Sequence, residues 1–267
     1  MRRVAAILDK EFSDLRQNPG VFLPAVLTGV VSIVLPFFVA ILVPALAGER
    51  LSDSSDFEIA VEMFRSEPAA RALSAEGAIQ AWLFQQFLLV LMLTPVAGSM
   101  SVAAYSVIGE KQARTLEPLL VTPITTFELL AAKVLGAAIP AIALTIICFT
   151  IYVLGVAALA ESGVWRVLLL PRSLAIVFLL GPLAAFAALQ LAVSVSSRSN
   201  DARSAQQIGA LIVLPMAGLL VAQLLGSLRL TMTAIVAIAG GLAALNAALV
   251  WLGVRVFDRE SILTRWR

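Results

Sequence analysis

Long apolar stretches separated by short polar segments dominate the hydropathy pattern of the chain. A helix needs about 20 residues to cross the hydrocarbon core of a bilayer, and each stretch reaches or exceeds that length. The pattern therefore predicts an all-α membrane protein with six transmembrane helices. The expected spans cover residues 21–47, 79–108, 127–159, 173–197, 206–227 and 232–254. Their excess length predicts tilt, kinks or interfacial ends.

Prolines interrupt five of the six expected spans, at Pro36, Pro95, Pro140, Pro182 and Pro215. These segments still favour helices, because neighbouring helices can accept the backbone groups that a proline leaves unpaired. The sequence leaves two uses open for the resulting kinks, packing in the bundle or gating.

The N-terminal residues 1–20 have a different, amphipathic pattern. One helical face carries Val4, Leu8, Phe12 and Leu15, and Lys10, Asp14 and Arg16 lie away from it. Such a pattern is typical of a helix that lies in the membrane interface, here against the inner leaflet. The Asn-Pro-Gly sequence at 18–20 ends this helix before the first span. A frayed tail is the alternative.

Composition and charge agree with a membrane protein. Of the 267 residues, 60% are hydrophobic and 13% are charged, with a mean hydropathy of +0.97, whereas a soluble domain has about 25% charged residues. Thirteen of the 19 lysines and arginines fall on one side of the predicted topology. The positive-inside rule therefore places both termini in the cytoplasm and residues 48–78 in a short extracytoplasmic loop. The net charge of +2 gives no reason to expect nucleic acid as a partner.

Several kinds of chemistry lack their residues. The chain has no histidine and a single cysteine, Cys148, and no aspartate lies within an expected span. Ser–His or Cys–His nucleophiles, histidine-ligated metal sites and intramembrane aspartate pairs are therefore excluded. No phosphate-binding G-x-x-x-x-G-K-[ST] motif is present. We accordingly expect no catalytic residue, no metal site and no ATPase activity in this chain.

The polar segment between the second and third expected spans is amphipathic. Leu116, Leu119 and Leu120 form an apolar face, and Gly109 and Pro123 bound the segment. A short helix parallel to the membrane would satisfy this pattern. From the residues alone, the segment fits either an ordinary interfacial loop or a rigid cytoplasmic element on which another protein acts.

The same segment resembles the signature of ABC-2 type transporter permeases. The matching positions are Glu110, Lys111, the Thr-Leu-Glu-Pro-Leu-Leu core at 115–120, the Thr-Pro-Ile at 122–124 and Lys133. Further similarity lies at residues 197–215 and 257–263. The chain looks most similar to the bacterial branch with sodium-export and multidrug-type permeases.

The resemblance implies one ABC-2 type transmembrane domain over residues 1–267, in the bacterial cytoplasmic (inner) membrane. It implies a second permease copy and separate ABC ATPase subunits, which bind ATP and Mg, so that this chain holds no cofactor itself. The N-terminal helix would be the elbow helix and the inner loop a cytoplasmic coupling helix. The implied ATPase contacts are Glu110, Lys111, Arg114, Thr115, Glu117 and Thr122.

Family members move substrate, usually outward, along a path between protomers that spans two and five line. The polar residues expected there are Gln85, Gln86, Thr94 and Gln223. Interhelical hydrogen bonding is the alternative role for these side chains. Because no charged residue is expected in the path, a hydrophobic or amphiphilic substrate is the hypothesis. A channel or membrane scaffold without an ATPase partner is the alternative function.

Overall fold

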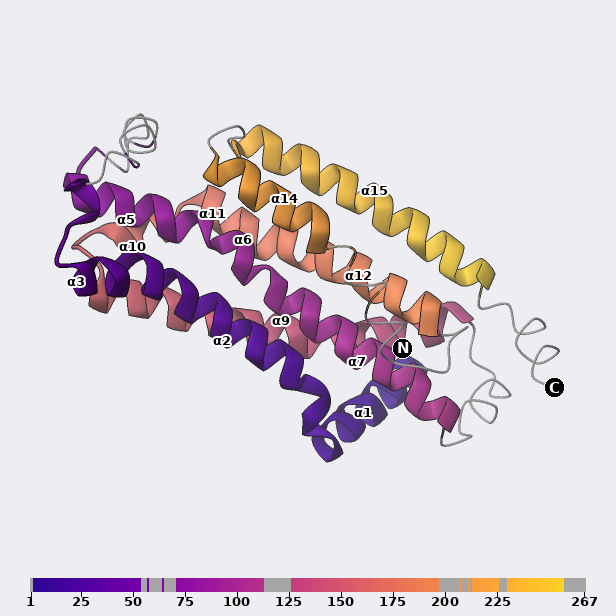
Figure 1. Cartoon of the computed structure of the whole chain (residues 1–267). Helices are drawn as coiled ribbons and strands as arrows, with labels where there is room; N and C mark the ends of the chain where they lie inside the picture. The colour runs from indigo at the N-terminus through magenta and orange to yellow at the C-terminus, as the bar shows by residue number, and fades with distance from the viewer. Residues whose placement is uncertain are drawn as a thin grey trace.

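The computed structural model describes residues 2–53, 57, 64, 71–112, 126–196, 207, 211, 213–225 and 230–256. Within these residues every regular element is a helix and there is no strand (Figure 1). Five helical stretches are long and apolar enough to cross a membrane. This confirms the predicted all-α membrane fold.

The five stretches correspond to five of the six expected spans. They cover Pro19–Ala47, Ala75–Ala103, Ala131–Leu159, Pro171–Val193 and Met232–Leu252. The remaining expected span, 206–227, contains the apolar helix α14 (Val213–Leu224), which is shorter than a full crossing. The count of six therefore stays a prediction.

The first half of the chain contains the N-terminal helix and two spans. Helix α1 (Arg2–Gln17) precedes the first span, and the short turn η3 (Leu51–Asp53) follows it. The first span consists of η1 (Pro19–Phe22), α2 (Leu23–Phe37), the π-helical turn η2 (Phe38–Leu42) and α3 (Val43–Ala47). The second consists of α5 (Ala75–Gln86), α6 (Leu88–Leu91) and α7 (Leu93–Gln112).

The second half begins with the longest helix, α9 (Thr126–Leu159), which forms the third span. The short helix α10 (Val164–Leu168) then reverses the chain. The fourth span consists of α11 (Pro171–Ala175), the π-helical turn η5 (Ile176–Leu180) and α12 (Gly181–Ser196). After α14, helix α15 (Met232–Val256) forms the last span.

Two boundaries differ from the expected ones. Helix α5 begins at Ala75, because Ser74 caps it by accepting a 2.9 Å hydrogen bond from the backbone N–H of Gly77. The segment expected as an extracytoplasmic loop, 48–78, therefore includes the first turn of α5. At the other end, α7 continues to Gln112, beyond the expected end of the span at residue 108.

Both π-helical turns precede a proline by the same distance. Turn η2 ends at Leu42, two residues before Pro44, and turn η5 ends at Leu180, two residues before Pro182. A proline ring clashes with the carbonyl four residues earlier and has no N–H to bond it. A wider turn at that point relieves the clash while the helix continues.

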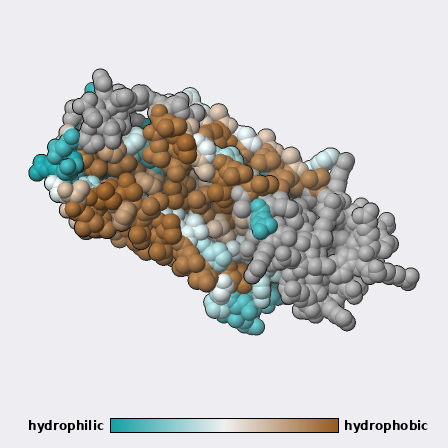
Figure 2. All heavy atoms as spheres, in the orientation of Figure 1, coloured by the Kyte–Doolittle hydropathy of each residue, from teal (hydrophilic) through white to brown (hydrophobic). Residues whose placement is uncertain are grey.

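The second and fourth spans form the centre of the bundle. The most apolar windows of these spans are 83% and 67% buried, whereas the first, third and last spans are 17–28% buried. Apolar atoms cover the visible face of the bundle between hydrophilic patches near its two ends (Figure 2). The outer helices thus present to lipid the faces that water cannot solvate.

Small residues bring α7 close to both α2 and α9. A Cβ atom placed on Gly98 of α7 would lie 3.1 Å from the Ala25 Cβ of α2 and 3.2 Å from the Ala141 Cβ of α9. Small residues at such a crossing allow helix backbones to approach closely, which drives helix packing in membranes.

Candidate functional site

The predicted ATPase contacts fall at the edge of the described residues. Glu110 and Lys111 lie in the last turn of α7, where the backbone is helical. The other four, Arg114, Thr115, Glu117 and Thr122, lie outside the described residues. The expected coupling helix and its contacts therefore stay predictions.

The described helices nonetheless show where the two ends of this segment lie in the bundle. Figure 1 shows α1 at the same end of the bundle as the C-terminal end of α7, and α1 packs against α9. The turn at Asn18 reverses the chain there: its N–H donates to the Asp14 carbonyl at 3.1 Å, and its carbonyl accepts from the Val21 N–H at 3.1 Å. The N-terminal helix is therefore held at the end of the bundle where α7 ends.

A buried ion pair joins α1 to α9. The Lys133 Nζ lies 3.0 Å from the Glu11 Oε1, and the two side chains are 2% and 5% exposed. One turn further along α9, a Cβ atom on Gly136 would lie 3.0 Å from the Glu11 Cβ. The stem of the Glu11 side chain therefore packs closely against Gly136, while its carboxylate bonds Lys133.

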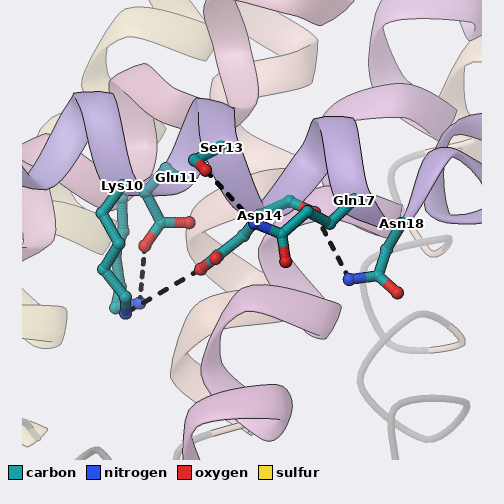
Figure 3. A network of polar contacts seen from close by, with 7 residues as sticks. Lys10, Glu11, Ser13, Asp14, Gln17 and Asn18 are labelled. Carbon is teal, nitrogen blue, oxygen red and sulfur yellow. Dashed lines mark hydrogen bonds and ion pairs between the residues drawn. The ribbon is translucent and has the colours of Figure 1, made fainter.

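The expected contact of the apolar face of α1 with the inner leaflet stays a prediction. The structure adds that Ile7 and Glu11 of this helix are buried against protein. The rest of the helix carries more exposed polar side chains (Figure 3). Lys10 and Asp14 form a 4.0 Å ion pair there, and Gln17 donates a hydrogen bond to Ser13. The sequence did hold a signal: Glu11 interrupts the apolar positions Ile7 and Leu15, and Lys133 stands alone in an apolar run.

Gln85, a predicted path residue, is bonded inside the bundle. Its Nε2 donates to the Ser173 Oγ at 3.0 Å, and that hydroxyl donates to the Val167 carbonyl at 2.9 Å. All three residues are buried. The contact ties the second span to the hairpin of α10 and α11, as interhelical hydrogen bonding would.

All four predicted path residues are buried in this single chain. Each of Gln85, Gln86, Thr94 and Gln223 also has a side-chain oxygen without a hydrogen-bond partner among the described residues. Buried polar atoms are normally paired, so these oxygens are unusual. Their role as a path stays a prediction, and in this conformation a substrate between two chains would not reach them.

The four residues do not converge on one point. The Thr94 side chain faces Gly29 of α2, where an added Cβ would lie 3.4 Å from its Cγ2 and 2.8 Å from the Cys148 Sγ. Gln85 instead faces Ser173 of α11. Gln223 lies on α14, which packs against α5 and α6. The second span therefore presents polar groups to several neighbours.

The opposite end of the bundle carries its own polar contacts. The Glu161 N–H donates to the Gln80 Oε1 at 2.9 Å, and the Ser52 N–H donates to the Glu76 Oε2 at 2.9 Å. The Ser74 hydroxyl contacts the Glu161 carboxylate. These bonds join the loops at the end of the bundle far from α1 (Figure 1). No group of His, Cys, Asp and Glu among the described residues is arranged to hold a metal ion.

Comparison with known proteins identifies the family. No curated protein and no solved structure matches the chain. The family model described as ABC-2 family transporter protein matches residues 75–239, well over half of the chain, from the start of α5 into α15. That match includes the inner loop between α7 and α9 and residues 197–215, two of the three segments that carried the resemblance in the sequence. The chain belongs to the ABC-2 family of transporter proteins and is a permease component of an ABC transporter.

Proposed function

We propose that this chain is the membrane-spanning permease subunit of an ABC exporter, driven by a separate ATPase subunit that binds ATP and Mg. The permease has two states, open to opposite sides of the membrane, and nucleotide binding to the ATPase favours one of them. The single observation that carries this proposal is the family match over residues 75–239.

A second copy of the permease and the bacterial inner membrane complete the proposal. Both termini lie in the cytoplasm, where most of the lysines and arginines then fall. Lys133 is not a free loop charge, because it is buried in α9. The remaining basic residues still favour the same orientation, and α1 and the end of α7 occupy one end of the bundle (Figure 1).

The substrate we propose is hydrophobic or amphiphilic. The second span, which is central to the bundle, contributes amides and three hydroxyls but no charged residue between Ile79 and Ala103. Because Gln85, Gln86, Thr94 and Gln223 are buried here, they would meet substrate only after helices separate. Strict selectivity for a small hydrophilic ion in a transport assay would contradict this proposal.

Co-purification in detergent tests the ATPase partner. The permease is expressed with the ABC ATPase that we expect to be encoded beside its gene, as wild type, as Glu117→Arg in the inner loop, and as Glu49→Arg. Glu49 is exposed at the other end of the first span and provides the matched control. We expect wild type and Glu49→Arg to bind the ATPase and change its hydrolysis rate, and Glu117→Arg to lose both effects.

The other outcomes separate the alternatives. Unchanged binding by Glu117→Arg keeps the transporter and moves the coupling contact to another segment. Absence of binding by the wild type to any co-expressed ATPase favours a channel or membrane scaffold.

A further inference from the structure

We propose that Glu11 and Lys133 form an ionic latch that fixes α1 to α9, so that the two helices move as one body during transport. The movement during transport rests on the proposed function, whereas the fixing of α1 is a property of this chain alone. Glu11 and Lys133 are thus positioning residues, which act through the helices that carry them.

The first argument is the choice of charged residues. Glu11 lies four residues from Ile7 and from Leu15, on the face of α1 that packs against the bundle. A pair of apolar side chains would fill this contact without the cost of removing two charges from water. The ion pair instead fixes how α1 is positioned along α9. The 3.0 Å contact forms only when the turn of α1 that carries Glu11 lies beside the turn of α9 that carries Lys133.

The second argument is that α9 holds Glu11 at two successive turns. Lys133 bonds its carboxylate, and Gly136 lies against its stem, with an added Cβ only 3.0 Å from the Glu11 Cβ and 3.2 Å from its Cγ. Leu8 of α1 lies at the same crossing, 3.8 Å from that Cβ position. A shift of α1 by one turn would therefore break the ion pair and move the Glu11 stem off Gly136.

The third argument is the place of the two helices in the chain. Helix α9 begins at Thr126, directly after the segment expected to contact the ATPase, and Lys133 follows about two turns later. Helix α1 leads through Asn18 into the first span. If the N-terminal end of α9 is displaced, the movement therefore follows two routes. It continues along α9, and it reaches the first span through the ionic latch and α1.

Distance measurement between spin labels tests the latch in the permease alone, reconstituted in lipid nanodiscs. The labels replace Ser13 on α1 and Ile139 on α9, both exposed, in a Cys148→Ala background that removes the single native cysteine. We compare wild type with Lys133→Met, the charge-exchanged Glu11→Lys/Lys133→Glu and the matched control Lys10→Met on the neighbouring residue. The measured quantity is the distribution of label distances.

We expect one narrow distribution for wild type and Lys10→Met, a broad or double distribution for Lys133→Met, and a narrow one again after charge exchange. A Lys133→Met distribution as narrow as that of wild type overturns the latch, since apolar packing would then hold α1. If Lys133→Met does not fold, the uncharged pair Glu11→Gln/Lys133→Met replaces it, and a narrow distribution there has the same meaning.

The movement as one body is tested in the complex with the ATPase, with and without trapping by ATP, Mg and vanadate. We expect the Ser13–Ile139 distance to stay the same in both states. A nucleotide-dependent change in that distance overturns the inference. If no ATPase binds, the proposed function fails, and the nanodisc measurement still decides whether the latch exists.

Discussion

The hydroxyl of Tyr152 on α9 donates a 2.8 Å hydrogen bond to the backbone carbonyl of Phe84 on α5. The Tyr152 ring also lies edge-on to the rings of Phe84 and Phe37, each with a centroid separation of 5.8 Å, and the Phe37 and Phe84 centroids are 5.1 Å apart. One side chain of the third span thus contacts the first span and bonds the second, at the point where α5 ends.

We expect Tyr152→Phe to destabilise the bundle by about 0.6–2 kcal/mol, the range for an interhelical hydrogen bond within a membrane. The ring contacts remain in this variant, so the change isolates the hydroxyl. The free energy of unfolding, measured by titration with SDS in mixed micelles, checks the value. Tyr105→Phe is the control, because Tyr105 is 41% exposed. Equal stability of the two variants would contradict the expected role of the bond.

Gly98→Ala is expected to destabilise the chain by about 1–3 kcal/mol, as overpacking does in a filled core. The added methyl group meets the Cβ atoms of Ala25 and Ala141, which are short side chains that cannot turn away. Gly240→Ala on α15 is the matched control, since among the described residues no atom outside its own turn of helix lies within 4 Å of its Cβ position. SDS unfolding of both variants makes the comparison. A loss at Gly240 as large as that at Gly98 would refute the packing argument.

Gln190 and Asn246 are expected to be energetically coupled. The Gln190 Nε2 donates to the Asn246 Oδ1 at 2.6 Å, and the Asn246 Nδ2 donates to the carbonyls of Leu183 and Leu242 at 3.0 and 2.8 Å. We expect Asn246→Leu and Gln190→Leu each to cost about 0.6–2 kcal/mol. The loss of stability in the double variant should be smaller than the sum of the two single losses, because no side chain of the pair is then left without its partner. Additive losses in this double-mutant cycle would show that the pair is not coupled.

Lys133→Met should be among the most destabilising single changes, at about 3–5 kcal/mol, because it leaves the Glu11 carboxylate buried without this partner. Lys10→Met should change stability by less than about 1 kcal/mol, since its ion pair with Asp14 is long, at 4.0 Å, and the two side chains are 38% and 49% exposed. Glu11→Gln/Lys133→Met should recover most of the loss. SDS unfolding of the three variants measures these differences. If Lys133→Met were as stable as Lys10→Met, leaving the Glu11 carboxylate buried without Lys133 would carry no free-energy cost.

Hydropathy alone was sufficient to predict the fold class, because lipid imposes a length and an apolar composition on every span. Five of the six expected spans coincide with helices long and apolar enough to cross a membrane. The family followed from residues in the inner loop together with residues 197–215 and 257–263, and the first two of these segments lie within the match to the family model. Helix ends were less accurate: the cap at Ser74 and the extension of α7 to Gln112 depend on local hydrogen bonds that hydropathy does not contain.

Partner choice within the bundle was harder to predict. An amphipathic pattern shows that α1 has a face to bury, but protein and lipid satisfy an apolar face equally well, so the contact with α9 did not follow from it. Similarly, a glutamine in a span predicts a polar neighbour without naming it, and the bond from Gln85 to Ser173 depends on how the helices pack.

Each of the π-helical turns η2 and η5 accommodates one residue more than a regular helical turn. Since each residue of an α-helix advances the side chains by about 100° around the axis, one extra residue rotates everything beyond it by that angle. The face that α3 or α12 presents to its neighbours is therefore out of phase with the helix on the other side of the turn. Deleting one residue from Phe38–Leu42 would restore a regular phase and, by doing so, turn the end of the first span away from its present contacts.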